Sequence, residues 1–417
     1  MTLRVKKSNL FGEVFAPPSK SHTHREYILA ALSCGTSEIS SPLFGDDTNA
    51  TLDCLEKLGA KISVAEGKVK ITGGCLKAPS EILDCRNSGT AIRILAGVAS
   101  KIKGTVKFTG DASLCGRPMK PLLNALEELG AFVSSENGCA PFSVSGVADG
   151  ASVSIRGDIS SQFISALLIS APLGKNSLRV KLTTELASEP YVDMTVAAMK
   201  IHGVEVLKTE DGFFVEKGQT YHAVSSTVSG DYSSAAFMLT AGALLGKVTV
   251  DNLLENDTQG DSEIITILKK FGADVKREGN SVTVSKSELR GAEINLSNAP
   301  DLFPIVCTAA AFAQGITKIT GAAHLKFKES NRIKTTAEFL KKMGADITET
   351  DDGCVIVGKN NLVGTAIHSY GDHRIAMSAV ICGLCAEGET VVDDIDCAAV
   401  SYPGFVSDIK KLGGDVK

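Results

Sequence analysis

A short pattern of apolar and polar positions recurs six times along the chain. In each copy an amphipathic stretch ends at a glycine, and an alternating stretch follows. The six glycines lie 69 to 73 residues apart, at Gly59, Gly130, Gly203, Gly272, Gly344 and Gly413. Apolar positions at helical spacing predict a helix with one buried face, and a glycine just past its end adopts the left-handed conformation at little cost. Each copy is therefore predicted to be a helix followed by a β-strand.

A second pattern has the same period. It is an almost wholly apolar run of small residues that opens with a polar or charged cluster. The six runs begin near Lys20, Asn87, Ser160, Asp231, Asp301 and Asp372. Helices that are apolar on every side lie in a protein interior. Alternating stretches such as 105–110 and 247–252 are typical of half-buried strands, so each unit is expected to combine strands, one exposed helix and one buried helix.

The repeat predicts a mixed α/β (α+β) fold of six units, grouped three plus three because six units exceed one ordinary core. The last copy ends at the C-terminus without the strands that follow the others, and an N-terminal strand beginning at Leu3 is expected to complete it. The first domain would then span 19–228, and the second would combine 1–18 with 229–417. A row of six solenoid modules is the weaker alternative, because a solenoid does not need fully apolar helices opened by charged clusters.

Composition narrows the class of protein. The net charge of −5 argues against general nucleic-acid or acidic-membrane binding, and no run approaches the roughly 20 apolar residues of a membrane span. The N-terminus lacks the apolar stretch of a signal peptide. The eleven cysteines are scattered, and several lie in apolar runs, which predicts reduced, buried thiols such as Cys34, Cys54, Cys307 and Cys382. We expect a cytoplasmic protein that binds neither nucleic acid nor membrane.

The polar clusters of the first half contain groups that bind anions. A helix N-terminus offers unpaired N–H groups and a partial positive charge. Three clusters add hydroxyl, amide or cationic side chains: Lys20, Ser21 and Arg25; Asn87, Gly89, Thr90 and Arg93; and Ser160, Ser161 and Gln162. Plain helix capping by Asn87 and Ser160 is the alternative for each cluster taken singly. Three such clusters at one period favour anion binding.

In the second half the runs open with aspartates. Capping is the preferred interpretation of Asp231, whereas Asp301 is a candidate general base and Asp372 is followed by His373 and Arg374.

The segment 326–333 is denser in charge. If it is helical, Lys328 and Arg332 share one face with Glu329 beside them. A solvated, salt-bridged helix face is the usual explanation of such a run when it stands alone.

Several other signals are weak. Cys382 and Cys385 have C-x-x-C spacing but lie in an apolar run, so a metal or redox site is disfavoured. The chain has neither a P-loop nor a G-x-G-x-x-G fingerprint after a strand. Cys115, two residues before Arg117, is interpreted as a small buried thiol rather than a nucleophile. No metal and no cofactor is therefore expected.

Taken together, the motifs carry a family resemblance over essentially the whole chain. They are the segments beginning Pro18-SKSHTHR, Asn87-SGTAIR, Gly116-RPM, Ser160-SQF, Ser188-EPYVDMT, Asp301, Lys328-ESNR, Gly371-DHRIAMS and Cys397-AAVSYPGF. In this order they resemble the EPSP synthase (3-phosphoshikimate 1-carboxyvinyltransferase) family of enolpyruvyl transferases. The resemblance implies a two-domain inverted α/β barrel, with three units in each domain, that closes over its substrates.

The resemblance also implies roles for single residues. The residues implied to bind 3-phosphoshikimate are Lys20, Ser21, Arg25, Ser160, Ser161, Gln162, Ser188, Tyr191, Asp301, His324 and Lys328. Those implied to bind or support phosphoenolpyruvate are Lys20, Asn87, Gly89, Thr90, Arg93, Arg117, Gln162, Arg332, His373 and Arg374. Catalysis is implied for Lys20, Asp301, Lys328 and Glu329.

The implied reaction is a step of the shikimate pathway toward chorismate and the aromatic amino acids. The acceptor hydroxyl adds to C2 of phosphoenolpyruvate while C3 gains a proton, and loss of phosphate and a C3 proton then leaves the enol ether. The reaction requires no cofactor, and we expect a monomer whose partners are these small molecules. Val400 stands where many members of the family have a lysine, and His324 stands at a position often filled by asparagine. Gly89 is retained, so glyphosate is expected to find space.

Two alternatives remain at this point. The sister enzyme that transfers enolpyruvate to UDP-N-acetylglucosamine has a catalytic cysteine further ahead of the arginine than Cys115 is from Arg117. It also has an asparagine at the position of Ser21. Both features favour phosphoshikimate as the acceptor. A non-catalytic protein that binds phosphorylated metabolites is the second alternative, although such a protein does not need carboxylates such as Asp301 and Glu329 facing anions.

Overall fold

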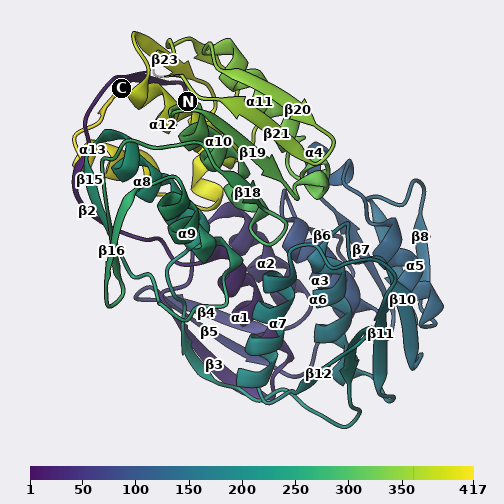
Figure 1. Ribbon diagram of the computed structural model, residues 1–417. Helices are drawn as coiled ribbons and strands as arrows, with labels where there is room; N and C mark the ends of the chain where they lie inside the picture. The colour runs from purple at the N-terminus through teal and green to yellow at the C-terminus, as the bar shows by residue number, and fades with distance from the viewer. Residues whose placement is uncertain (360) are drawn as a thin grey trace. The chain divides into compact units, whose positions relative to one another are not determined.

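The computed structural model describes residues 1–359 and 361–417, which fold as two compact units. The contiguous unit is Pro18–Val228, and the discontinuous unit combines Met1–Pro17 with Ser229–Lys417 (Figure 1). Each unit has a hydrophobic core of its own. The substrate roles assigned to the two domains remain predictions.

Within the described residues each unit contains three four-stranded sheets. In the contiguous unit these are β14 (Ser225–Thr227), β3 (Gly35–Ser40), β5 (Lys68–Gly73) and β4 (Lys61–Ala65); β6 (Leu83–Asp84), β7 (Thr105–Thr109), β9 (Phe142–Ser145) and β8 (Phe132–Ser135); and β10 (Ser152–Ile155), β11 (Leu178–Leu182), β13 (Gly212–Val215) and β12 (Val206–Thr209). In the discontinuous unit they are β2 (Phe11–Phe15), β15 (Lys247–Asp251), β17 (Ser281–Ser285) and β16 (Asp274–Glu278); β18 (Glu293–Asn295), β19 (Ile316–Thr320), β21 (Gly353–Val357) and β20 (Asp346–Thr350); and β22 (Ala366–Ile367), β23 (Glu389–Val392), β1 (Leu3–Lys6) and β24 (Asp415–Val416).

All six sheets share one topology, given above in spatial order. The first strand pairs parallel to the second, and the remaining pairs are antiparallel. This common topology is the structural form of the repeat that the sequence predicts.

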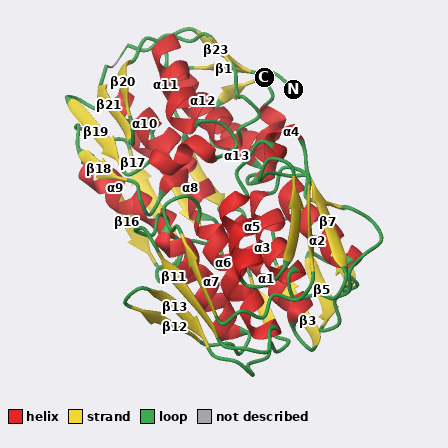
Figure 2. Cartoon of the chain, turned by 90° about the vertical axis from the view of Figure 1, so that its right-hand side faces the viewer, coloured by secondary structure: helices red, strands yellow, loops and turns green. Residues whose placement is uncertain are grey.

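The six apolar runs form helices at the centre of each unit, as the sequence predicts. They are α1 (Lys20–Leu32), α3 (Gly89–Ala99) and α6 (Ser161–Ser170) in the contiguous unit and α8 (Tyr232–Leu245), α10 (Phe303–Ala311) and α12 (His373–Cys385) in the discontinuous unit. Most of their residues are buried. Within each unit the strands lie outside these helices (Figure 2). The fold is therefore an inverted α/β arrangement, because the helices and not the sheets occupy the centre.

The second set of helices confirms the glycine pattern. These helices are α2 (Asp46–Lys57), α5 (Lys120–Glu128), α7 (Glu189–Ile201), α9 (Ile264–Lys270), α11 (Arg332–Lys342) and α13 (Phe405–Lys411). The six predicted glycines follow them with φ between 87° and 104°. Shorter helical segments are α4 (Ala112–Cys115), η1 (Ala171–Leu173), η2 (Gly260–Glu263), η3 (Pro300–Leu302), η4 (Ala323–Phe327) and η5 (Ile395–Val400).

In each unit, a strand from one end of its sequence pairs with a strand from the other end. As predicted, β1 pairs with both β23 and β24 and so completes the last repeat. β2 then supplies the parallel edge strand of the β15 sheet. In the contiguous unit β14 does the same for the first sheet by pairing with β3.

The eleven cysteines are all free thiols. Cys54, Cys307 and Cys382 are buried as predicted, but the prediction for Cys34 is wrong because this residue is exposed. Cys34 follows the C-cap of α1, where the chain leaves the interior. In the part of the chain that the structure describes, no helix is both long enough and apolar enough to cross a membrane.

Candidate active site

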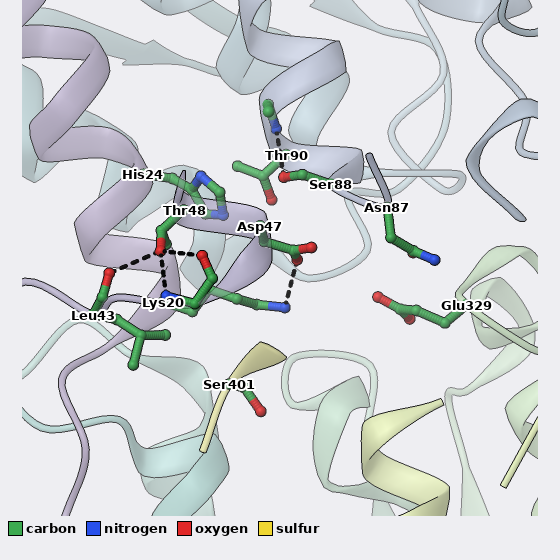
Figure 3. Close-up of polar contacts among 12 residues, drawn as sticks. Lys20, His24, Leu43, Asp47, Thr48, Asn87, Ser88, Thr90, Glu329 and Ser401 are labelled. Carbon is green, nitrogen blue, oxygen red and sulfur yellow. Dashed lines mark hydrogen bonds and ion pairs between the residues drawn. The ribbon is translucent and has the colours of Figure 1, made fainter. Parts of the chain in front are cut away.

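In the contiguous unit Lys20 opens helix α1 and points toward a carboxylate. Ser19 caps the helix by accepting a hydrogen bond from the His22 N–H at 3.4 Å. Lys20 Nζ donates to Asp47 Oδ2 at 3.0 Å, as the dashed line in Figure 3 shows. The two side chains are only 14% and 8% exposed, so the pair is partly shielded from solvent. Sequence reasoning missed Asp47, because acidic residues in a first helical turn are common.

Arg25 is a buried cation held by neutral groups. Its Nε donates to Thr195 Oγ1 at 2.8 Å, and its two Nη atoms donate to the backbone carbonyls of Ser21 (2.9 Å) and Tyr191 (2.8 Å). Burial lowers the pKa of Arg25 to about 10, so the group is still a cation at neutral pH. Since these acceptors are uncharged, the bonds orient the guanidinium without neutralising it.

The N-termini of α3 and α6 are joined through Gln162. Arg93 Nη1 donates to Gln162 Oε1 at 2.6 Å, and Gln162 Nε2 donates to Thr90 Oγ1 at 2.9 Å. Gly89 lies beside this network. A Cβ at Gly89 would be 3.4 Å from Arg93 Nη1, 3.4 Å from Arg117 Nη1 and 3.5 Å from Gln162 Oε1. Two cations and an amide therefore converge on the start of α3.

Asn87 orients Arg117 instead of capping the helix. Ser88 is the N-cap of α3 and accepts from the Ala91 N–H, so the capping interpretation of Asn87 is wrong. Arg117 Nη1 donates to the Asn87 backbone carbonyl at 3.2 Å, and Arg117 Nη2 donates to Asn87 Oδ1. The one-residue difference matters because it releases the Asn87 amide to bind a cation.

The remaining candidates of this unit lie at the starts of α6 and α7. Ser160 caps α6 as the alternative interpretation proposed, accepting from the Gln162 N–H at 3.3 Å, and Ser161 is the first helical residue. Ser188 precedes α7 with a left-handed φ of 57°. Tyr191 lies in the first turn of α7 and gives its carbonyl to Arg25. In the contiguous unit most of the predicted residues thus lie near the N-terminal ends of α1, α3, α6 and α7. Arg117 lies between α4 and α5 and contacts Asn87, just before α3.

In the discontinuous unit Arg332 is the centre of a charged cluster. Arg332 Nε donates to Asp372 Oδ2 at 2.9 Å, Nη1 to Asp301 Oδ1 at 2.8 Å and Nη2 to Glu329 Oε2 at 2.6 Å. The Arg332 side chain is 1% exposed and that of Asp372 is fully buried. Burial opposes the charge of Arg332, but the carboxylates of Asp372, Glu329 and Asp301 outweigh it and raise the pKa.

Asp301 is held by three cations. In addition to Arg332, Arg374 Nη2 donates to Asp301 Oδ2 at 2.8 Å, and Lys328 Nζ lies 3.5 Å from Asp301 Oδ1. Asp301 lies in η3, just before α10, and its side chain does not cap the helix. We call Asp301, Lys328, Glu329, Arg332, Asp372 and Arg374 the Asp301 cluster. All of these residues except Asp372 were predicted site residues. Asp372 is the N-cap of α12 and accepts a hydrogen bond from the Arg374 N–H.

The predicted helix face that would pair Lys328 with Arg332 is wrong. Helix α11 begins at Arg332, and Asn331 is its N-cap. Lys328 lies before it in extended backbone after η4. The solvated alternative is wrong for Arg332 as well, because this side chain is buried. The Asn331 side chain caps α11 by accepting a hydrogen bond from the Lys334 N–H, so the helix does not extend back to Lys328. Lys328 lies near Asp301 from the segment before the helix.

Two histidines were site candidates. His324 lies in η4 and is buried. Burial, together with the charge of Lys328, lowers the pKa of His324 to about 4, although Asp301 acts in the opposite direction. His324 is therefore neutral at pH 7. His373 is the first residue of α12 and is also buried, next to Arg374.

Sequence reasoning missed the buried carboxyl group of Asp261. This residue lies in η2, and Ser233 in the first turn of α8 donates a hydrogen bond to its Oδ2. Burial, with the charge of Asp301, raises the pKa of Asp261 to about 7, while Arg374 and the Ser233 hydroxyl act in the opposite direction. Asp231 caps α8 by accepting from the Ser234 N–H at 2.8 Å, which confirms the capping interpretation.

The two clusters have different chemical character. In the contiguous unit helix N-termini and the cations of Lys20, Arg25, Arg93 and Arg117 favour anions. In the Asp301 cluster cations alternate with carboxylates, so it can bind an anion and also accept a proton. No group of three or more His, Cys, Asp or Glu residues that could hold a metal ion occurs among residues 1–359 and 361–417.

Comparison with known proteins agrees with these features. The family model for EPSP synthase (3-phosphoshikimate 1-carboxyvinyltransferase) matches residues 5–409. The chain is 55% identical to the 3-phosphoshikimate 1-carboxyvinyltransferase of Methanocorpusculum labreanum, over 100% of both chains, and 42% identical to that of Methanocaldococcus jannaschii, over 100% of this chain and 99% of the relative. It resembles a solved EPSP synthase structure from Acinetobacter baumannii with a TM-score of 0.84 and 30% identity, covering 100% of this chain and 99% of the other. The chain therefore belongs to the EPSP synthase (3-phosphoshikimate 1-carboxyvinyltransferase) family.

Proposed function

We propose that this chain transfers the carboxyvinyl group of phosphoenolpyruvate to the 5-hydroxyl of 3-phosphoshikimate, giving 5-enolpyruvylshikimate 3-phosphate and phosphate. The observation that carries the proposal is the Asp301 cluster, in which Arg332, Arg374 and Lys328 surround one carboxylate in a chain of this family. Such a cluster combines anion binding with a proton acceptor, and the reaction needs both.

The proposed phosphoshikimate site uses mainly polar groups at helix starts. The residues proposed to bind phosphoshikimate are, in the contiguous unit, Lys20, Ser21, Arg25, Ser160, Ser161, Gln162, Ser188 and Tyr191 and, in the discontinuous unit, Asp301, His324 and Lys328. Support comes from the N-termini of α1 and α6, whose N–H groups and hydroxyls are suited to phosphate oxygens. Arg25 adds a buried positive charge whose hydrogen-bond acceptors in Ser21, Tyr191 and Thr195 are neutral. His324 is neutral at pH 7, so one ring nitrogen can donate and the other can accept.

The proposed phosphoenolpyruvate site is rich in arginine. The residues proposed to bind or support phosphoenolpyruvate are, in the contiguous unit, Lys20, Asn87, Gly89, Thr90, Arg93, Arg117 and Gln162 and, in the discontinuous unit, Arg332, His373 and Arg374. Support comes from the hydrogen bonds that fix Arg117 and Gln162 and from the small space left by Gly89. Guanidinium groups bind carboxylate and phosphate in two-point contacts, so fixed arginines orient this substrate. Val400 offers no charge at the end of η5, so one phosphate contact common in the family is expected to be missing.

The chemistry is addition followed by elimination. In the first step Asp301 takes the proton of the attacking hydroxyl, a new C–O bond forms at C2, and C3 receives a proton from the Lys328–Glu329 pair. In the second step C3 loses a proton and the C–O bond to phosphate breaks, which restores the double bond. Carboxylates stabilise the positive character that develops at C2, and the cations hold the anionic groups of both substrates.

Phosphate release with defined acceptors tests this proposal. We expect phosphate when phosphoenolpyruvate is mixed with 3-phosphoshikimate and none with UDP-N-acetylglucosamine. Asp301→Ala and Glu329→Ala are each expected to lower kcat about 10²- to 10⁴-fold, the usual contribution of a positioned acid or base. Asp274→Ala, which removes an exposed carboxylate from β16, is the matched control and should leave the rate unchanged.

The alternative functions give different results. Phosphate release with UDP-N-acetylglucosamine but not with 3-phosphoshikimate would show that the UDP-sugar is the acceptor. Tight binding of both substrates without phosphate release would favour a non-catalytic metabolite-binding protein. The monomeric state and cytoplasmic location remain predictions, and sedimentation of the purified chain checks the first of them.

A further inference from the structure

Asp111 uses both carboxylate oxygens to tie two segments together. Its Oδ1 accepts from the Leu114 N–H at 2.8 Å and so caps α4. Its Oδ2 accepts from Asn87 Nδ2 at 2.7 Å. Its own N–H donates to the Arg86 carbonyl at 2.8 Å. One side chain therefore fixes α4 against the turn that precedes α3.

These bonds determine how Arg117 is held. Because the Nδ2 end of the Asn87 amide faces Asp111, its Oδ1 end is turned toward Arg117, where it accepts from Nη2. Arg117 Nη2 also donates to Ser113 Oγ at 3.1 Å, and Ser113 lies in the short helix that Asp111 caps. Asp111 thus controls two side chains that accept hydrogen bonds from Arg117.

We propose that Asp111 is a positioning residue for phosphoenolpyruvate. It orients the Asn87 amide directly and caps the short helix that carries Ser113. The Asn87 amide and the Ser113 hydroxyl in turn hold the Arg117 guanidinium in the orientation that receives the anion. The inference rests on the proposed function of Arg117, and it assigns Asp111 no contact with either substrate.

These contacts require a carboxylate at position 111. Asp111 accepts two hydrogen bonds through two different oxygens, whereas the amide of an asparagine has one oxygen and one NH₂ group. In Asp111→Asn either the Leu114 N–H or the Asn87 NH₂ must face another donor. If the Asn87 amide then turns over, its NH₂ group faces the Arg117 guanidinium, and an attractive contact becomes repulsive.

Steady-state kinetics in both substrates test the proposal. For Asp111→Asn we expect KM for phosphoenolpyruvate to rise about tenfold, the effect of one hydrogen bond to a charged group. KM for 3-phosphoshikimate and kcat should change less than about twofold. The matched control is Asp53→Asn, which removes a carboxylate that pairs with neighbouring Arg86 on the surface and should change neither KM.

A double-mutant cycle separates positioning from general loss of structure. If Asp111 acts through Asn87, most of the Asp111→Asn effect on KM for phosphoenolpyruvate should disappear in an Asn87→Ala background. The melting temperature of each variant is measured in parallel. Additive effects in the cycle, or a rise of both KM values that follows the loss of melting temperature, would overturn the positioning role.

Arg117→Ala distinguishes this inference from the proposed function. If Arg117→Ala leaves KM for phosphoenolpyruvate unchanged, the proposed function of Arg117 is wrong, and the inference fails with it. If Arg117→Ala raises this KM but Asp111→Asn does not, the proposed function stands and only the role of Asp111 is wrong.

Discussion

Asp301 and Asp261 have the same side chain but opposite surroundings. Two guanidinium groups and an ammonium group surround Asp301, which suits a carboxylate. Asp261 is buried against the Ser233 hydroxyl, and Asp301 adds an unfavourable negative charge nearby. The pKa of Asp261 is raised to about 7, so this residue is expected to be partly protonated at neutral pH.

The pH dependence of stability follows from this difference. The pKa of Asp261 is raised to about 7 in the folded chain, above the roughly 3.9 of an unfolded aspartate. The folded state then binds more protons between these values, so stability falls as pH rises from about 4 to 7. In Asp261→Asn the side chain does not titrate, so this pH-dependent loss of stability is absent. Relative to wild type the variant should gain stability between pH 4 and 8, on the order of 4 kcal/mol.

Urea unfolding at pH 4, 6 and 8 measures this gain. The charges of Arg374 in α12, Asp301 in η3 and Asp231 at the α8 N-cap also influence the pKa of Asp261. The free energy of unfolding of the variant is therefore compared with that of wild type at each pH. Asp274→Asn, on the exposed face of β16, is the control and should show no pH-dependent difference. A constant difference between Asp261→Asn and wild type across this range would mean that Asp261 does not titrate there.

The identities of the residues predict which type of chemistry the site performs, but they do not predict which side chains contact one another. Repeated helix starts bearing Lys20, Gly89 and Ser161 predict anion binding, and the structure places these residues at helix N-termini. The partner of Lys20 was missed because Asp47 belongs to a different helix. No local pattern reports a contact across 27 residues, which depends on how α1 packs against α2.

At the scale of whole elements, the close approach of α3 and α6 positions the Gln162 network. A Cβ built at Gly97 would lie 2.5 Å from the backbone oxygen of Ala166 and 2.9 Å from its carbonyl carbon. Real Cβ atoms do not come this close to backbone, so the two helices are this near only because position 97 is glycine. Their first turns carry Thr90 and Gln162, which are hydrogen bonded.

Gly97→Ala should therefore push α3 and α6 apart. Overpacking a tight core contact costs about 1–3 kcal/mol, which outweighs the ~1 kcal/mol that alanine gains over glycine in a helix. We also expect KM for phosphoenolpyruvate to rise, because the Thr90–Gln162 and Arg93–Gln162 bonds lengthen. Urea unfolding and steady-state kinetics measure the two effects.

The control for this substitution is Gly404→Ala. Gly404 has an ordinary φ of −86°, and a Cβ added there would meet nothing closer than Asp408 Oδ2 at 3.7 Å. Its stability should stay within about 0.5 kcal/mol of wild type. An equal loss in both variants would show that the approach of α3 to α6 is not the limiting contact.

The order of elements was largely predictable, because glycine-ended helices and apolar helices repeat with one period. Strand pairing was not predictable from that pattern. The parallel edge strand β14 pairs with β3, which lies almost 190 residues earlier in the chain, and a contact between such distant segments depends on how the whole unit packs. The prediction that Lys328 and Arg332 share a helix face was wrong for a local reason. Asn331 caps the helix, which therefore begins at Arg332, later than the charge pattern indicates.

At the scale of the whole molecule, the two units differ in what each needs from the rest of the chain. All strands of the contiguous unit come from Pro18–Val228. The discontinuous unit needs β1 and β2 from residues 1–17 in two of its three sheets. The segment also contributes Leu3, Val5, Leu10 and Val14 to the core, all at most 2% exposed.

These contributions predict how fragments behave. Burying each Leu or Val side chain is worth about 1.5–3 kcal/mol, so losing four removes about 6–12 kcal/mol. That equals the whole stability of a typical domain, about 5–15 kcal/mol. Fragment 229–417 should therefore not fold alone, whereas fragment 18–228 should fold cooperatively. Circular dichroism and urea titration of each fragment measure this difference.

Complementation makes the prediction specific to the N-terminal strands. A synthetic peptide of residues 1–17 should restore a cooperative transition to fragment 229–417, since β1 regains β23 and β24 and β2 regains β15. The same peptide with Val5→Asp places a charge in a fully buried position and should not restore it. If fragment 229–417 folds without the peptide, or if the Val5→Asp peptide restores it equally well, the N-terminal strands do not complete this unit. The stability of the discontinuous unit would then come from its own three central helices, and residues 1–17 would only be attached to its surface.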